Sequence, residues 1–69
     1  MDKDVTDLMS YNSSSMDGEL MSVDKCVCGK EFEYWEYAIG IYRDHAYPCP
    51  ICGRKFYFVN NVKIYEVID

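Results

Sequence analysis

The chain has 69 residues, a length that allows one domain and that rarely folds without a disulfide, a metal or a partner chain. Apolar residues make up 49% of the sequence and aromatic residues 16%, which excludes a wholly disordered protein, and no apolar run reaches the roughly 20 residues needed to cross a bilayer. The net charge of −5 lacks the basic excess expected of a nucleic-acid-binding protein and disfavours that class.

Residues 1–22 are predicted to form a flexible, acidic N-terminal tail. Ser, Asn, Asp and Gly dominate the middle of this segment, a composition typical of loops or disorder. Residues 1–24 contain six acidic residues and one lysine, whereas six acids and six bases balance in residues 25–69. The acidic segment would repel phosphate groups and attract a basic protein surface. The folded domain is therefore expected at residues 23–69.

One apolar cluster near the N-terminus offers an alternative to a disordered tail. Val5, Leu8 and Met9 are spaced for one turn of helix. Either Thr6 or Asp4 would cap that turn. The alternative is therefore a short linear segment that folds when it binds a partner.

Residues 30–47 are predicted to form two strands. One strand face would carry Trp35, Tyr37, Ile39 and Ile41. Phe32 and Tyr34 fall on the other face, so the apolar face changes near Tyr34, as at a bulge or turn. Phe32, Trp35, Ile39 and Tyr42 would also share one face of a helix, which is the alternative. The many aromatic and β-branched residues, with Gly40 among them, favour strands.

Residues 55–68 are predicted to form a β-hairpin. Its two arms, residues 56–59 and 62–68, are rich in aromatic and β-branched residues. Asn60 and Asn61 lie between the arms, and asparagine tolerates the positive φ that a two-residue hairpin turn requires. Because this hairpin directly follows the last cysteine of the chain, a metal bound by that cysteine would be coupled to the sheet.

All four cysteines of the chain lie in two short pairs, each followed by glycine and a basic residue. They are Cys26, Cys28, Cys49 and Cys52. Two such pairs, brought together by a short β segment, can form one tetrahedral metal site with four thiolate ligands. The chain begins without the basic start and apolar run of a secretory signal, so a cytoplasmic location is expected. In that reducing compartment paired cysteines usually hold a metal.

The two cysteine pairs differ in spacing. Neighbouring sulfurs around zinc are about 3.8 Å apart. Cys49 and Cys52 reach this distance through a tight turn in which Gly53 supplies a positive φ. Cys26 and Cys28 are one residue closer in sequence, but side chains at positions i and i+2 of an extended segment project to the same side. Both pairs can therefore reach one metal.

Residues beside the cysteines suggest how the charge of the site is balanced. The flanking bases are Lys25, Lys30, Arg54 and Lys55. His45, four residues before Cys49, is an alternative ligand that would replace one thiolate, although an ordinary loop histidine is the simpler interpretation.

With these motifs the chain resembles the zinc-ribbon family, and its Cys-Pro-Ile-Cys-Gly run at residues 49–53 also resembles that of rubredoxins. The resemblance spans about residues 23–69. It implies a three- or four-stranded antiparallel sheet with the metal at one end, held by Cys26, Cys28, Cys49 and Cys52. The first pair departs from both families, which have two residues between the cysteines. Zinc is the metal expected, and iron is the alternative that the rubredoxin resemblance implies.

An interaction module is the function expected from the sequence. Catalysis is not expected, because four thiolate ligands leave no open metal position and the chain has a single histidine. Tyrosines are more numerous than so small a core needs, and exposed tyrosines are good interface anchors. We expect a regulatory module that binds a protein with a basic surface, such as an accessory factor of the transcription machinery or a viral inhibitor of a host enzyme.

Two other functions remain alternatives. Single-stranded nucleic acid would stack on Tyr, Phe and Trp side chains, with lysines and arginines on its phosphates. Electron transfer through an iron centre would follow from the rubredoxin resemblance. No membrane association is expected from the sequence.

Overall fold

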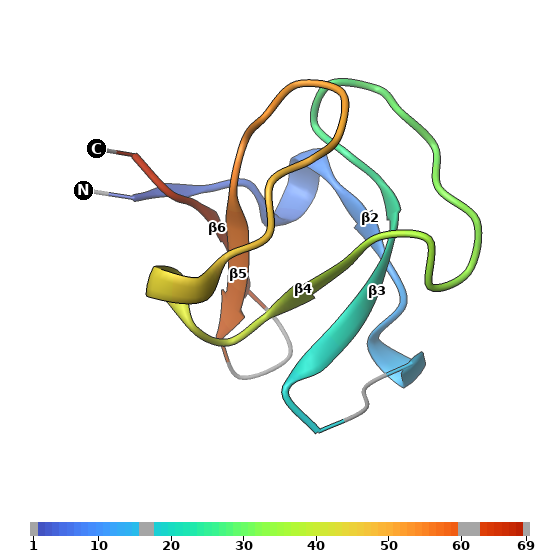
Figure 1. The fold of residues 1–69 in the computed structure, drawn as a ribbon, viewed down its shortest axis with the longest axis horizontal. Helices are drawn as coiled ribbons and strands as arrows, with labels where there is room; N and C mark the ends of the chain where they lie inside the picture. Colours follow the sequence, from blue (N-terminus) through green and yellow to red (C-terminus); the bar gives the residue numbers. More distant parts are fainter. Residues whose placement is uncertain (1, 16–17, 60–62, 69) are drawn as a thin grey trace.

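In the residues that the structure describes, the chain folds into one curled sheet of six short strands, with three turns of 3-10 helix between them. The computed structural model describes residues 2–15, 18–59 and 63–68. In chain order the elements are β1 (Lys3–Asp4), η1 (Thr6–Leu8), β2 (Ser10–Tyr11), η2 (Ser13–Ser15), β3 (Leu20–Lys25), β4 (Ala38–Gly40), η3 (Arg43–His45), β5 (Phe56–Val59) and β6 (Lys63–Glu66). Figure 1 shows the strands curling around a common interior.

The sheet confirms the prediction of a small, mostly β protein and differs from it in detail. Its strand order is β1-β6-β5-β4-β3-β2. All neighbouring strands are antiparallel except β4 and β5, which pair in parallel through Gly40 and Tyr57. The sheet therefore has six strands and mixed pairing, where three or four antiparallel strands were expected. The extra strands come mainly from the N-terminal segment.

Within residues 2–15 and 18–22, which are described, the structure differs from the flexible tail that was expected. Val5 and Met9 are buried in the core, at 0% and 6% exposure. The Val5 amide donates a hydrogen bond to the Ile64 carbonyl at 2.9 Å, and β1 pairs with β6. Polar composition suggested disorder, but a sheet this small needs the apolar residues of this segment to complete its interior.

The helical turn considered as the alternative for this segment is present. It is η1, and the carboxylate of Asp4 accepts hydrogen bonds from the Thr6 amide at 3.0 Å and the Thr6 hydroxyl at 2.6 Å. The turn packs on its own chain, since Thr6 also accepts a 2.9 Å hydrogen bond from the Ile64 amide.

The strand β3 crosses the expected boundary between residues 22 and 23. Met21, Ser22 and Val23 are all fully buried, and β3 pairs with β2 on one side and β4 on the other. The Ser22 amide donates to the Ser15 hydroxyl, and that hydroxyl donates to the Asn12 carbonyl. The strands that lie before position 23 in the described residues are therefore an integral part of the sheet.

The stretch at residues 30–47 contains one strand and a tight turn. Strand β4 follows a turn in which the Glu36 amide donates to the Glu33 carbonyl at 2.9 Å. Trp35 lies in this turn with a φ of 63°, so the predicted change of apolar face near Tyr34 is a turn. The helical alternative is wrong, and so is the second strand.

The hairpin predicted at residues 55–68 is confirmed for its arms. Strands β5 and β6 pair antiparallel from Phe56 opposite Glu66 to Val59 opposite Lys63. Phe56, Phe58 and Ile64 project into the core and are buried. The predicted Asn-Asn turn lies outside the described residues.

One carboxylate joins distant parts of the chain. Asp2 accepts hydrogen bonds from Arg43 Nε at 2.8 Å, the Tyr57 hydroxyl at 2.7 Å and the Ile68 amide at 3.1 Å. These bonds, that of Arg43 first, hold the pKa of Asp2 well below its usual range. The two chain ends consequently lie side by side (Figure 1).

None of the helices in the described part of the chain is long and apolar enough to span a membrane.

Candidate metal centre

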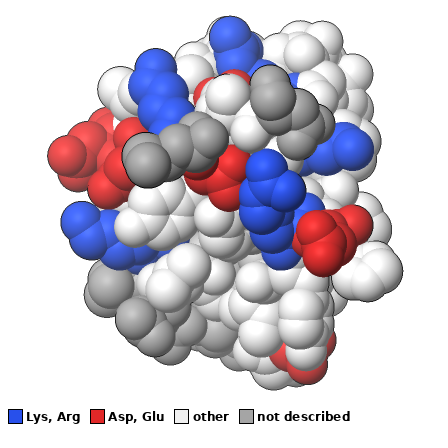
Figure 2. All heavy atoms as spheres, turned by 90° about the vertical axis from the view of Figure 1, so that its left-hand side faces the viewer, with Lys and Arg blue, Asp and Glu red and all other residues white. Residues whose placement is uncertain are grey.

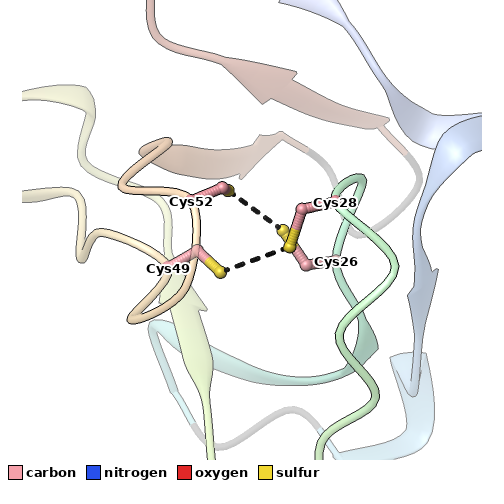
Figure 3. Close-up of side chains that lie close together, drawn as sticks. All are labelled: Cys26, Cys28, Cys49 and Cys52. Carbon is pink, nitrogen blue, oxygen red and sulfur yellow. Dashed lines mark hydrogen bonds between the residues drawn. The ribbon is translucent and has the colours of Figure 1, made fainter.

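The four cysteines meet at one end of the sheet. Their Sγ atoms all lie within 4.8 Å of one another. The Sγ atoms of Cys26 and Cys52 are 3.7 Å apart, and those of Cys28 and Cys49 are 3.9 Å apart. Figure 3 shows two loops facing each other, with two sulfurs from each loop turned toward the space between them. The structure thus brings together all four residues that the sequence singled out.

The first loop follows β3 and closes on itself. The Cys26 amide donates to the Lys30 carbonyl at 2.9 Å, and the Gly29 amide donates back to the Cys26 carbonyl at 3.0 Å. A bridge between Lys25 and Glu31 seals the loop. Gly29 has a φ of 96°, which a residue with a side chain rarely adopts. The short spacing therefore still produces a complete turn.

The second loop repeats this construction with one more residue. The Cys49 amide donates to the Arg54 carbonyl at 2.8 Å, and the Gly53 amide donates back to the Cys49 carbonyl at 2.9 Å. Pro48 and Lys55 form the closing bridge, and Gly53 has a φ of 78°. The repetition explains why each cysteine pair is followed by glycine.

Backbone amides point at the sulfurs from within these loops. The Ile51 amide donates to Cys49 Sγ at 3.5 Å, and the Cys28 amide makes the same kind of bond to Cys26. Such hydrogen bonds favour the thiolate form and orient a ligand atom. Both loops therefore support their first cysteine in the same way.

The distances suit a tetrahedral ion. Four ligands at a metal–sulfur distance of about 2.3 Å place neighbouring sulfurs about 3.8 Å apart, and the two measured separations of 3.7 and 3.9 Å bracket this value. A disulfide needs sulfurs about 2.05 Å apart, so the cysteines are free thiols. The cluster could hold a metal ion of tetrahedral preference, and its geometry is common to zinc and iron.

The thiols differ in their surroundings. Cys26 and Cys49 are buried, Cys52 is half-buried and Cys28 is exposed. Burial raises the pKa of Cys26. Burial also acts to raise the pKa of Cys52, but hydrogen bonds from the backbone and guanidinium of Arg54 outweigh it and bring the pKa to about 7. A bound cation would draw all four toward the thiolate form, because metal and proton compete for the sulfur.

Arg54 is the basic residue that contacts the sulfurs. Its guanidinium bonds to Cys52 and also pairs with Glu66, with Nε and Oε2 3.6 Å apart. Lys30 instead lies over the ring of Phe32, with Nζ 5.8 Å from the ring centroid. The sequence grouped four flanking bases together, and the structure distinguishes Arg54 from the rest by these contacts.

Tyr37 supports the site and was not identified from the sequence as part of it. Its hydroxyl donates a 2.6 Å hydrogen bond to the Tyr47 carbonyl, two residues before Cys49. Its ring packs against Phe32 with centroids 5.0 Å apart. Burial, followed by the nearby charge of Cys49, raises the pKa of Tyr37. In the sequence, Tyr37 was placed on the apolar face of an expected strand. That position indicated that its side chain is buried, but not that it supports the metal site.

His45 is not part of the cysteine cluster. It ends the helix η3, is exposed, and its ring meets that of Tyr42 edge-on with centroids 6.3 Å apart. Among the described residues, the only group of metal-binding side chains that includes sulfur is the cluster of four cysteines.

The surface charges do not gather by sign on the face that carries the chain ends. Blue and red side chains are interspersed there (Figure 2). Ion pairs join Arg43 to Asp2 and Lys63 to Asp4. This face lacks the continuous basic stripe typical of a nucleic-acid interface within the residues that the structure describes.

Comparisons with known proteins identify no relative of this chain. A scan against protein-family models, a search of curated proteins and a search of solved structures found no match to this chain. The resemblance to zinc ribbons therefore rests on the cysteine motifs alone, and what the molecule itself presents is a small, mostly β fold with four cysteines that could hold a metal ion.

Proposed function

We propose that this protein is a small zinc-binding module that acts by binding another protein rather than by catalysis. Zinc would be held by Cys26, Cys28, Cys49 and Cys52. The observation that carries the proposal is the convergence of four sulfurs within 4.8 Å on two loops of matching construction. Four thiolates complete a tetrahedral shell, which is typical of structural rather than catalytic zinc.

The metal would stabilise the fold because each loop is continuous with the sheet. The first loop extends β3, and the second leads through Lys55 directly into β5. The sheet interior is small, so the free energy of metal binding would supply much of the free energy of folding. The bound ion would thus fix the surface that a partner recognises.

Regulation of a larger machine fits a module of this kind. The acidic charge excess would favour a partner with a basic surface, by steering it and by complementing its charge. An accessory factor of the transcription machinery, or a viral inhibitor of a host enzyme, would use such a rigid, non-catalytic domain.

Metal analysis combined with chelation tests the proposal. Protein purified from cells grown with both metals is expected to be colourless and to contain one zinc per chain, and a strong chelator is expected to abolish its native circular dichroism. Red protein containing iron would favour an electron carrier. An unchanged spectrum and thermal midpoint after verified metal removal would contradict a structural role for the ion.

Single-stranded nucleic acid remains the second candidate, because exposed Tyr34, Trp35 and Tyr47 are the kind of side chains on which bases stack. Binding to an oligonucleotide that weakens steeply with salt would support it. The interspersed charges of Figure 2 favour a protein partner.

A further inference from the structure

An apolar groove lies beside the second cysteine loop and is not explained by metal binding. Its volume is about 540 Å³, and its lining includes Leu20, Trp35, Glu36, Tyr47, Pro48 and Pro50. A smaller hollow of about 230 Å³ shares Leu20 and Tyr47 and continues past Glu19, Tyr42 and His45. The two hollows are neighbours, since they share Leu20 and Tyr47, and we call them together the depression. Trp35 and Tyr47 remain 37% and 56% exposed along it, although both are large aromatic residues.

The backbone is strained to present Trp35 at this groove. The φ of 63° at Trp35 makes it the only residue other than glycine with positive φ in the described part of the chain. Left-handed geometry is unusual for a bulky residue, and such outliers cluster at binding sites. A glycine would fit this turn without strain. The turn therefore places the indole at the groove at a conformational cost.

Hydrogen bonds hold this turn on both sides. The Trp35 amide donates to the Ser22 hydroxyl at 3.0 Å, and Ser22 is fully buried. The amide of Ser22 in turn donates to the hydroxyl of Ser15 at 3.0 Å. On the other side of the turn, the Glu33 amide donates to Glu36 Oε1 at 2.9 Å. The turn is therefore fixed from both ends, and the groove is preformed rather than assembled by a ligand.

Neighbouring strands limit one mode of peptide binding at the groove. Strands β3 and β4 border it, and each lies between two other strands of the sheet. Binding by addition of a strand is therefore disfavoured. A ligand would be held mainly by side chains, of which aromatic rings and proline rings are the most prominent.

Hydrogen-bonding capacity and charge define the ligand further. Among the described residues, no hydrogen bond engages the indole N–H of Trp35 or the hydroxyl of Tyr47, so both can donate to a ligand. The charged side chains along the depression include the carboxylates of Glu36 and Glu19, and none of the described residues that line it is a lysine or arginine. The ligand should therefore carry positive charge and offer carbonyl oxygens.

We propose that this groove binds a short, extended segment of a partner protein that contains prolines and carries lysine or arginine. Proline segments are already extended, present carbonyls without amide N–H groups that need partners, and pack their rings on aromatic side chains. The basic residues would meet Glu19 and Glu36. This inference rests on the proposed function, in that it assigns a partner class to the protein-binding module.

Calorimetric titration of the metal-loaded protein with synthetic peptides tests the proposal. The probe is a short peptide of prolines and leucines with arginines at one end. It is expected to bind saturably, at least tenfold more weakly when the arginines are replaced by glutamates, and not measurably when the prolines are replaced by glycines. Equal binding of all three peptides, or of none, would overturn the assignment.

Variants separate the groove from the fold. Trp35→Gly removes the indole and relieves the strained turn, so it should fold and bind the peptide at least tenfold more weakly. Tyr47→Phe removes one donor and should weaken binding several-fold. Leu8→Ser changes an equally apolar side chain, 54% exposed and outside the groove, and should bind like the wild type. Wild-type affinity in Trp35→Gly would refute the proposal.

Two further readouts separate this inference from its alternatives. Sedimentation of the wild type should show a monomer; a dimer that Trp35→Gly dissociates would mean that a second copy occupies the groove and would overturn the proposal. Zinc content and circular dichroism are measured on the same samples. Absence of bound metal would contradict the proposed function, whereas metal-loaded, folded protein that binds no peptide would contradict the groove assignment alone.

Discussion

Replacement of Val5 by alanine tests whether the N-terminal segment belongs to the fold. Val5 is fully buried, and its amide is bonded to Ile64 at the far end of the chain. The substitution removes two methyl-sized groups, worth about 1.6 kcal/mol in transfer free energy at ~0.8 kcal/mol each. The cavity left behind adds to this, for an expected loss of about 2–3 kcal/mol. A chain of this size has a free energy of unfolding of about 5 kcal/mol, so the loss would be large.

Leu8→Ala is the matched control for this substitution. Leu8 lies three residues further on in the same turn and is 54% exposed, so the change should cost less than about 0.5 kcal/mol. Urea unfolding of the metal-loaded proteins, followed by circular dichroism, gives both free energies. A value for Val5→Ala as small as that of Leu8→Ala would show that the segment does not pack on the sheet.

Three further substitutions test the site and its supports. Cys49→Ser is expected to abolish stoichiometric metal binding while His45→Ala retains it, and equal metal loss in both would make the histidine a ligand. Asp2→Asn should lower the thermal midpoint of unfolding at neutral pH. Because folding lowers the pKa of Asp2, the difference in thermal midpoint between wild type and variant should persist above about pH 4 and shrink as the pH falls further. A difference that grows in acid would refute this. Ser22→Ala should cost about 1–3 kcal/mol in urea unfolding, since the turn amide of Trp35 loses its acceptor in the fully buried Ser22. A neutral effect would argue against the hydrogen-bonded support of that turn.

Features that short stretches of sequence encode could be predicted here. The cysteine loops are such a case, because glycine after each pair and the spacing of the sulfurs are local properties. The β5–β6 arms are another, since aromatic and β-branched residues alternate on either side of a turn signal. Each of these predictions needed fewer than about fifteen contiguous residues.

Features that depend on distant partners could not be predicted. Val5 is hydrogen-bonded to Ile64, which lies far away in the sequence. The two residues of β1 carry no sequence pattern that predicts a strand, and their extended structure depends on pairing with β6. The parallel pairing of Gly40 with Tyr57 likewise depends on the path that the chain takes through the second cysteine loop, between β4 and β5. Trp35 occupies a turn position with positive φ, which glycine usually fills, so turn propensities did not predict this conformation for a tryptophan.

The N-terminal segment has a consequence for the solubility of the protein. Strand β1 covers β6 and strand β2 covers β3, so a single short stretch of chain occupies both edges of the sheet. Removing residues 2–11 would leave two rows of unpaired amide and carbonyl groups on one molecule. Exposed strand edges of this kind pair with other copies, and two per molecule permit open-ended growth. Trimming this acidic stretch would thus turn the domain into a building block for aggregates.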